Sequence, residues 1–141
     1  MIHNVRDKNE KLLARFVFRP LHDSGVRFFS EAEHALQVGT LTHAEGHVVQ
    51  PHLHNPVPRS SVGNQEVLYL LSGSMIANIY DENKVLVHSV RMNPHDFVIL
   101  FAGGHGFKAL TDVEVFEVKQ GPYVGEADKE RFYADASVPK A

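Results

Sequence analysis

Short stretches in which apolar and polar residues alternate follow one another along most of the chain. KLLARFVFR (11–19) alternates and is rich in Phe and Val, and SMIANIY (74–80) places Met75, Ala77 and Ile79 on one parity. Alternation with a period of two predicts a strand with one buried face. The same reading predicts strands within GVRFF (25–29), ALQVGTLTH (35–43), EVLYLLSG (66–73), VLVHSV (85–90), FVILF (97–101) and VEVFEVKQG (113–121).

Turn-forming residues separate these stretches. DENK (81–84) and NPHD (93–96) predict turns, and GGHG (103–106) is expected to interrupt a pair of strands. Two short pieces have a helical pattern: SEAEHAL (30–36), with Ser30 as a cap, and GEADKERFY (125–133). Many short strands without a long helix predict one all-β domain over residues 1–141, a sandwich or a barrel. The end of the chain, ADASVPKA (134–141), has the composition of a frayed tail.

Composition and charge narrow the class of protein. The 141 residues are 43% hydrophobic and 22% charged, with a net charge of −3 and a pI near 6.3. That balance argues against a nucleic-acid partner, and the apolar runs are too short to cross a membrane. The N-terminal MIHNVRDKNEK lacks the apolar core of a signal peptide, and the chain has no cysteine. We therefore expect a cytoplasmic protein in which histidines and carboxylates hold any metal.

Two of the ten histidines are separated by a single residue. On a strand, His52 and His54 would project the same way, close enough for both imidazoles to bind one ion. Pro51 and Pro56 bracket the pair and would stiffen its backbone. Two solvated histidines on an exposed strand would have the same pattern, so further ligands are needed. The other histidines of the chain, apart from His105, read as surface or turn residues.

The spacing around this pair is more specific. Gly46 precedes His52 by a gap of five residues, and Glu66 precedes Gly73 by a gap of six. This resembles the first motif of the cupin superfamily, G-x5-H-x-H-x(3,4)-E-x6-G. HDFVILFAGGHGF (95–107) occupies the place of the second motif, with His105 as its histidine. The resemblance covers about residues 40–120.

The sequence departs from the cupin pattern in two places. Eleven residues rather than three or four separate His54 from Glu66, and Phe101 stands where the second motif has proline. The spacing to Gly73 still keeps Glu66 in register. Gln65 is the alternative to Glu66 as a ligand, but on a strand its side chain would point to the opposite face. The glycines on both sides of His105 let the backbone bend to aim its ring.

The resemblance implies a double-stranded β-helix, or jelly-roll barrel, with extra N-terminal strands and a short C-terminal helical tail. It also implies that His52, His54, Glu66 and His105 bind one divalent transition metal. Three imidazoles and one carboxylate suit Fe, Mn, Ni or Zn, and the sequence does not choose among them. Four protein ligands on a six-coordinate ion leave two positions for water, substrate or dioxygen. The alternatives are a metal that only stiffens the barrel, or an empty site.

Residues near this site could bind a substrate. Arg59 lies in the long loop and could clamp a carboxylate or phosphate, or it could be a solvated arginine. Lys119 and Tyr123 could reach a ligand, although charge on a strand edge also prevents aggregation. A barrel interior would be filled by apolar side chains that are core rather than substrate wall: Leu68, Leu70, Phe97, Ile99, Phe101 and Phe107.

These observations favour a metal-binding cupin that acts as an enzyme on a polar small molecule, such as a sugar derivative or an organic acid. Isomerase or epimerase, lyase and dioxygenase reactions all remain open, and no catalytic residue is assigned. The alternative is a non-catalytic ligand-binding or sensor cupin. A homodimer is expected, because cupins commonly pair through an added N-terminal strand and KLLARFVFR is an edge strand suited to that role.

Overall fold

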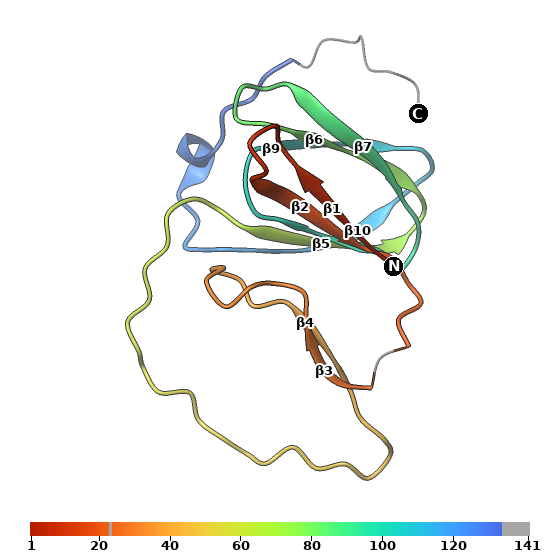
Figure 1. The fold of residues 1–141 in the computed structure, drawn as a ribbon, viewed down its shortest axis with the longest axis vertical. Helices are drawn as coiled ribbons and strands as arrows, with labels where there is room; N and C mark the ends of the chain where they lie inside the picture. Colours follow the sequence, from red (N-terminus) through yellow and green to blue (C-terminus); the bar gives the residue numbers. More distant parts are fainter. Residues whose placement is uncertain (23, 134–141) are drawn as a thin grey trace. The chain divides into compact units, whose positions relative to one another are not determined.

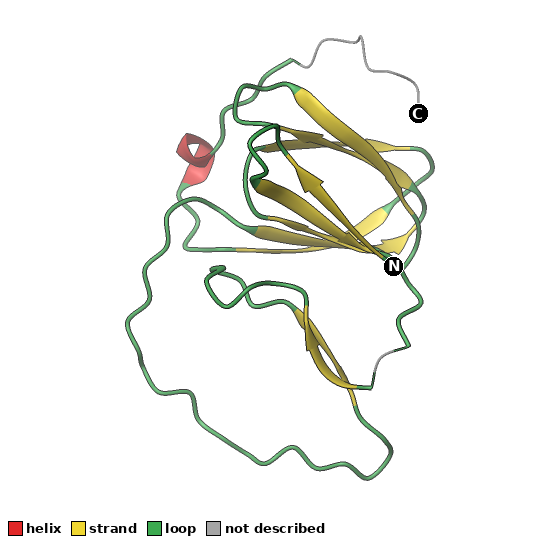
Figure 2. Cartoon of the chain, viewed as in Figure 1, coloured by secondary structure: helices red, strands yellow, loops and turns green. Residues whose placement is uncertain are grey.

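The computed structural model describes residues 1–22 and 24–133, which fall into two compact units. The first unit combines Met1–Leu21 with the chain from Asn64 onward, and the second is His22–Gly63. Strands make up 42% of the described residues and helical residues 3%, which confirms the all-β class (Figure 2). The expectation of a single domain stays a prediction. Within the described residues, no helix has the length and apolar character needed to span a membrane.

The first unit consists of two antiparallel sheets (Figure 1). The strands of the larger sheet are β1 (Ile2–Arg6), β2 (Leu12–Val17), β5 (Glu66–Ser72), β8 (Phe97–Leu100) and β10 (Glu114–Lys119). Those of the smaller sheet are β6 (Met75–Tyr80), β7 (Leu86–Met92) and β9 (Gly104–Ala109). The strand orders are β1–β2–β8–β5–β10 and β7–β6–β9. The two sheets are not closed into a barrel, and β9 and β10 each lie at the edge of their sheet.

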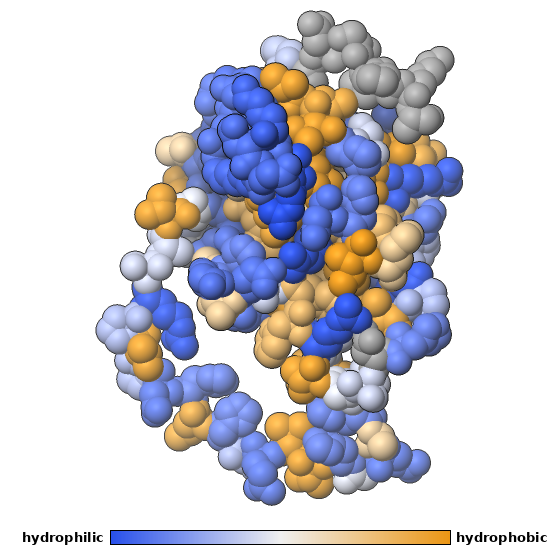
Figure 3. Space-filling view, viewed as in Figure 1, coloured by the Kyte–Doolittle hydropathy of each residue, from blue (hydrophilic) through white to orange (hydrophobic). Residues whose placement is uncertain are grey.

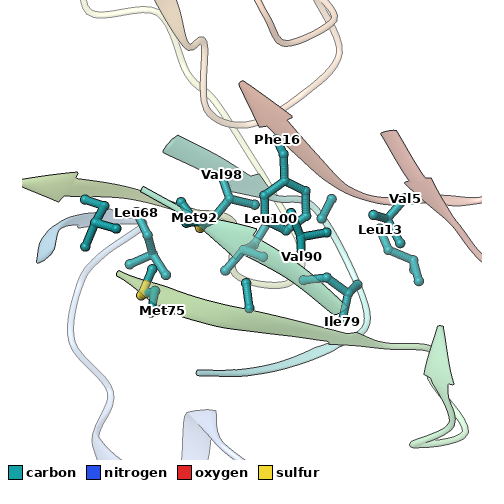
Figure 4. Close-up of a cluster of buried hydrophobic side chains, with 13 residues drawn as sticks. Val5, Leu13, Phe16, Leu68, Met75, Ile79, Val90, Met92, Val98 and Leu100 are labelled. Atoms are coloured by element: carbon teal, nitrogen blue, oxygen red, sulfur yellow. The ribbon is translucent and has the colours of Figure 1, made fainter. Parts of the chain in front are cut away.

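Side chains from both sheets pack into one core (Figure 4). Leu13 and Phe16 of β2 and Leu70 of β5 are fully buried in the larger sheet. The smaller sheet contributes the β6 residues of odd number, from Met75 to Ile79, as their shared parity predicts. Burial of one such large side chain stabilises the fold by about 1.5–3 kcal/mol. The core therefore holds the two sheets face to face and fixes which residues of each strand point inward.

The register of β8 corrects part of the predicted interior. Phe97 and Ile99 are buried, but they pair with Tyr69 and Val67 rather than with Leu68. Directly paired residues lie on one face of an antiparallel sheet, so Phe97 and Ile99 face away from the shared core. Leu68 and Leu70 face it as predicted. The predicted core positions Phe101 and Phe107 are instead partly exposed and 41% exposed, respectively.

Two predictions about strand position are also corrected. KLLARFVFR forms β2, but β2 lies between β1 and β8 and is not an edge strand. The edge is β1. The break predicted over 103–106 is shorter than expected: Gly103 lies between β8 and β9, whereas Gly104, His105 and Gly106 belong to β9.

Two aspartate carboxylates stabilise the predicted turns between strands by accepting hydrogen bonds from backbone N–H groups. The Asp81 carboxylate accepts hydrogen bonds from the backbone N–H groups of Asn83 and Val85, at 2.9 and 3.0 Å. Asp96 is buried, and its carboxylate accepts from the N–H groups of Asn93 and Arg19, at 2.8 and 3.0 Å. These bonds satisfy backbone donors where the chain leaves the sheets.

The second unit contains one hairpin, formed by β3 (Gly25–Phe28) and β4 (Gly39–Thr42). The helix predicted over 30–36 is wrong: this stretch is made of turns and bends. Ser30 is buried, and its hydroxyl accepts a hydrogen bond from the N–H of Val38 at 2.8 Å instead of capping a helix. After β4, residues 43–63 contain no strand and are all exposed.

The predicted helical tail is also wrong. Residues 125–133 contain only a 3₁₀ turn, Gly125–Asp128. Side-chain contacts hold the chain beyond this turn: Arg131 pairs with Glu126, and Phe132 lies edge-on to Tyr80 of β6, with ring centroids 5.2 Å apart. Local packing against the sheet therefore decides this segment's conformation. The predicted frayed tail, 134–141, lies outside the described residues.

Candidate metal and ligand site

Glu66 is the first residue of β5 and points toward the interior of the first unit. It shares the inward parity of Leu68 and Leu70, and its exposed fraction is 7%. A buried carboxylate is costly unless a charge or a hydrogen bond compensates it. Glu66 therefore needs a partner at the end of the core.

His105 supplies that partner from the other sheet. It is paired with Ile79 of β6, a core residue, so its ring is on the inward face of β9. His105 Nε2 lies 3.3 Å from Glu66 Oε2. The sequence predicted both residues as ligands of one site, and the structure brings them together across the two sheets.

The environment of Glu66 favours its charged form. The hydrogen bond donated by His105 holds the pKa of the Glu66 carboxyl below its usual value, against the opposing effect of burial. The positive charges of His105, Lys119 and Lys129 lower this pKa further. Glu66 is thus an anion at neutral pH, which is the state that a metal ligand requires.

His52 and His54 form a second pair, in the second unit. Their ring centroids are 5.1 Å apart and the rings meet edge to face. They lie on an extended segment rather than a strand, so the strand geometry expected for them is not present. His52 Nδ1 lies 3.0 Å from the carbonyl oxygen of Gln50. A carbonyl only accepts, so Nδ1 carries the proton and the neutral ring keeps its Nε2 lone pair for a ligand.

The four predicted ligands thus fall into two pairs, each inside its own unit. Among residues 1–22 and 24–133, no group of three or more His, Asp or Glu side chains is arranged to hold a metal ion. The segment that carries His52 and His54 mixes hydrophilic and hydrophobic residues along its length (Figure 3).

The three predicted substrate-binding residues differ in position. Lys119 ends β10 directly opposite Glu66, on the same face of the sheet, and its Nζ lies 4.0 Å from a Glu117 carboxylate oxygen. Tyr123 is 79% exposed, beyond the end of β10. Arg59 is exposed in the second unit, where its guanidinium donates to the carbonyl of Val57 at 3.4 Å. Of the three, Lys119 lies next to the Glu66–His105 pair.

Sequence reasoning missed several features near these residues. Lys129 lies close enough to Glu66 to affect its charge, and no local pattern indicates this. His95 has a φ of 74°, and its Nδ1 lies 2.9 Å from the Tyr69 hydroxyl. The left-handed backbone of His95 is the conformation that glycine favours.

Two further histidine pairs stack, although the sequence pattern predicts single surface or turn residues at these positions. His3 and His88 stack with centroids 5.0 Å apart, on β1 and β7. His43 and His47 stack with centroids 4.0 Å apart. The spacing of four residues between His43 and His47 is a signal that could have identified that pair from the sequence.

No protein-family model, curated protein or solved structure matches this chain. The cupin resemblance therefore rests on the motif residues themselves, and the family stays a prediction.

Proposed function

We propose that the protein is a cupin-type metal protein in which His52, His54, Glu66 and His105 bind one divalent transition metal, and that it acts as an enzyme on a polar small molecule. The observation that carries the proposal is the pairing of Glu66 with His105, a buried carboxylate and an imidazole on facing sheets 3.3 Å apart. A buried carboxylate whose pKa is perturbed by a specific partner is a candidate functional group. The motif spacing indicates His52 and His54 as the two other ligands.

The donor set fits a metal of this class. One anionic carboxylate and three neutral imidazoles suit Fe, Mn, Ni or Zn. The hydrogen bond from His52 to the Gln50 carbonyl has the pattern of a metal-binding histidine, whose second ring nitrogen donates to a backbone oxygen. Glu66 is already held in its charged form.

The proposal requires the chain between β4 and β5 to complete the jelly roll. The strands β9 and β10 offer unpaired edges to an added strand. Residues 43–63 are long enough to supply it and form no strand of their own. In this proposal, the metal links His52 and His54 to Glu66 and His105, so metal binding and closure of the barrel occur together.

The charges near the pair favour an anionic substrate. A divalent ion with one carboxylate ligand keeps a net positive charge, and Lys119 and Lys129 add to the positive field at Glu66. Such a field attracts carboxylate or phosphate groups. Lys119 would bind the anion beside the ion, Tyr123 would donate from its hydroxyl, and Arg59 would clamp an oxygen pair from the loop. We therefore favour an organic acid or a sugar phosphate over a neutral sugar.

The chemistry follows the class of the site. When bound, the metal supplies Lewis acidity or redox capacity, as in an isomerase or epimerase, a lyase or a dioxygenase. Glu66 balances its charge, and the apolar core beneath excludes water from that side. The absence of cysteine fits a reducing compartment, and we propose a cytoplasmic location. We also propose a homodimer, paired through the β1 edge rather than through β2.

A double-mutant cycle of metal affinity tests whether the two pairs share one ion. Metal-free protein is titrated with Zn²⁺ by calorimetry in the wild type, in His52→Ala, in His105→Ala and in the double variant. Each single change is expected to weaken binding more than about tenfold. The double variant should lose less than the sum of the two, because both ligands serve one site. Additive losses, or an unchanged affinity in either single variant, would refute the shared site.

Turnover assays separate an enzyme from a ligand-binding protein. Panels of organic acids and sugar phosphates are incubated with metal-loaded protein under air and under argon. Oxygen uptake would identify a dioxygenase, and anaerobic turnover an isomerase or lyase. Binding without turnover across the panel would favour the non-catalytic alternative. Arg59→Ala should weaken binding of the anion and leave metal content intact.

A further inference from the structure

Asn64 lies two residues before Glu66, where the chain enters β5, and it carries a buried acceptor without a partner. Among the side chains that the structure describes, Asn64 Oδ1 is the one buried polar atom that takes part in no hydrogen bond. An acceptor that is removed from water and left unpaired costs free energy, so folded proteins rarely retain one. A donor on a bound molecule would remove that cost.

The side-chain amide of Asn64 is held in one orientation by Asp128. Asp128 ends the 3₁₀ turn Gly125–Asp128, which follows β10 (Figure 1). Asn64 Nδ2 donates to the Asp128 carboxylate at 2.9 Å. An ionised carboxylate only accepts, so a flipped amide would place two acceptors against each other. The nitrogen therefore faces Asp128, and Oδ1 faces away from it.

The backbone directs Asn64 and Glu66 to the same side of the larger sheet. Gln65, which lies between them, continues the pairing of β5 with β10. Its N–H donates to Gln120 Oε1 at 2.7 Å, and its carbonyl accepts from the N–H of Gln120 at 3.3 Å. Side chains alternate along such an extended chain, so Asn64 shares the inward parity of Glu66.

The segment after β10 links the two residues a second time. Asp128 binds Asn64, and the next residue, Lys129, is close enough to Glu66 for its charge to lower the pKa of that carboxyl. Since His105 lies 3.3 Å from Glu66, the unpaired acceptor belongs to the same end of the core as the carboxylate–imidazole pair.

We propose that Asn64 is a specificity-determining residue of the Glu66–His105 site, and that its Oδ1 accepts a hydrogen bond from a hydroxyl group of the substrate. This inference rests on the proposed function and narrows its substrate class. Lys119 and Lys129 provide the positive field for an anionic group, and Asn64 requires a donor beside it. Hydroxy acids and sugar phosphates have both groups. A site built to pair a hydroxyl discriminates strongly against the analogue that lacks it.

Pairs of acids that differ by one hydroxyl group test this assignment. Zinc-loaded protein is titrated by calorimetry with malate and succinate, and with lactate and propionate. We expect the wild type to bind each hydroxy acid at least about tenfold more tightly than its partner. Asn64→Leu should lose that preference and keep the wild-type affinity for succinate and propionate. Asn9→Leu, at an exposed asparagine between β1 and β2, is the matched control and should retain the preference.

Variants of Asp128 test the orientation of the amide while the Asn64 acceptor stays in place. Asp128→Ala removes the partner of Nδ2 and should reduce the preference for the hydroxy acids. Asp128→Asn should restore it, because its side-chain oxygen can still accept from Asn64. Thermal melting followed by circular dichroism verifies that each variant folds. If Asn64→Leu does not fold, the difference between the two Asp128 variants decides.

Two results would overturn the role of Asn64: equal binding of both members of each pair by the wild type, or a full preference retained in Asn64→Leu. The second result would mean that the metal, rather than the amide, recognises the hydroxyl. Metal content measured on the same samples separates this inference from the four-ligand centre. A wild type that holds metal and binds succinate without any preference overturns the role of Asn64 alone. A wild type that holds no metal and binds none of the acids overturns both.

Discussion

Gly73 is the position where the fold tolerates a side chain least. It follows β5 and has a φ of 81°. A Cβ added there would lie 2.0 Å from the carbonyl oxygen of Asp112 and 2.9 Å from both Thr111 Oγ1 and Val113 Cγ1. It is also the glycine whose spacing fixes Glu66 in the sequence motif. We therefore expect Gly73→Ala to destabilise the first unit strongly.

Two independent effects set the magnitude. The left-handed backbone costs a residue with a Cβ about 1–2 kcal/mol. The contact with Asp112 is to a backbone oxygen, which cannot rotate away as a side chain can, and the required shift of the chain costs about 1–3 kcal/mol. The total, about 2–5 kcal/mol, is a large part of the roughly 5–15 kcal/mol that stabilises a typical domain. The melting temperature should fall by roughly 6–15 °C.

Chemical and thermal denaturation, followed by circular dichroism, measure this loss. Gly125→Ala is the matched control, because Gly125 has a φ of 79° and its added Cβ would meet no atom within 4 Å. It carries the backbone cost alone, about 1–2 kcal/mol. If Gly73→Ala loses no more stability than Gly125→Ala, the close approach of Asp112 to Gly73 is not a feature of the folded protein.

Three further predictions concern the other end of β5 and the turn before β8. His95→Gly relieves about 1–2 kcal/mol of left-handed strain and loses one hydrogen bond, worth about 0.5–1.5 kcal/mol, so its urea midpoint should stay near that of the wild type. His95→Ala keeps the strain and loses the bond, so its midpoint should be lower; equal midpoints for the two variants would contradict the strain. Asp96→Ala leaves two backbone N–H groups without their acceptor, and we expect a loss of about 2–4 kcal/mol in urea denaturation, with a smaller loss for Asp96→Asn. A loss for Asp96→Ala within about 0.5 kcal/mol, the range of an ordinary surface change, would show that these bonds do not form. The pKa of Glu66 is lowered in the folded state from 4.5, so its contribution to stability is complete above about pH 4.5 and is lost as the pH falls through the folded value. Stability measured between pH 6 and pH 3, a range chosen to bracket roughly that value, should therefore fall less steeply in Glu66→Gln than in the wild type, and parallel curves would refute the shift.

Local patterns in the sequence located most of the strands because most strands carry their own alternation or a short apolar run. Met75, Ala77 and Ile79 show this, since their shared parity matches a shared buried face. The same rule fails for Phe97 and Ile99, because β8 is apolar on both faces and parity then says nothing about direction. Strand order is not local either. The sequence of β2 does not reveal that β1 covers its edge, since that pairing depends on residues elsewhere in the chain.

The candidate site was also predictable only where local sequence patterns determine the positions of its residues. Glu66, which the spacing to Gly73 singles out, is the first residue of β5, and His105 lies 3.3 Å from it on the facing sheet. That these two residues bind a metal stays a prediction. The path of the long loop after His54 could not be predicted from local patterns. Eleven residues between His54 and Glu66 break the local link between the two pairs, so no short-range pattern fixes how the loop runs. Lys129 shows the same limit, because it influences Glu66 from a distant part of the sequence.

The metal content of the purified protein tests the central claim most directly. After gel filtration, elemental mass spectrometry of the wild type should find close to one divalent transition metal per chain. His52→Ala and His105→Ala, one from each unit, should both be nearly free of it, while His34→Ala keeps the wild-type content. Full metal content in either His52→Ala or His105→Ala would contradict a single ion bound by both pairs.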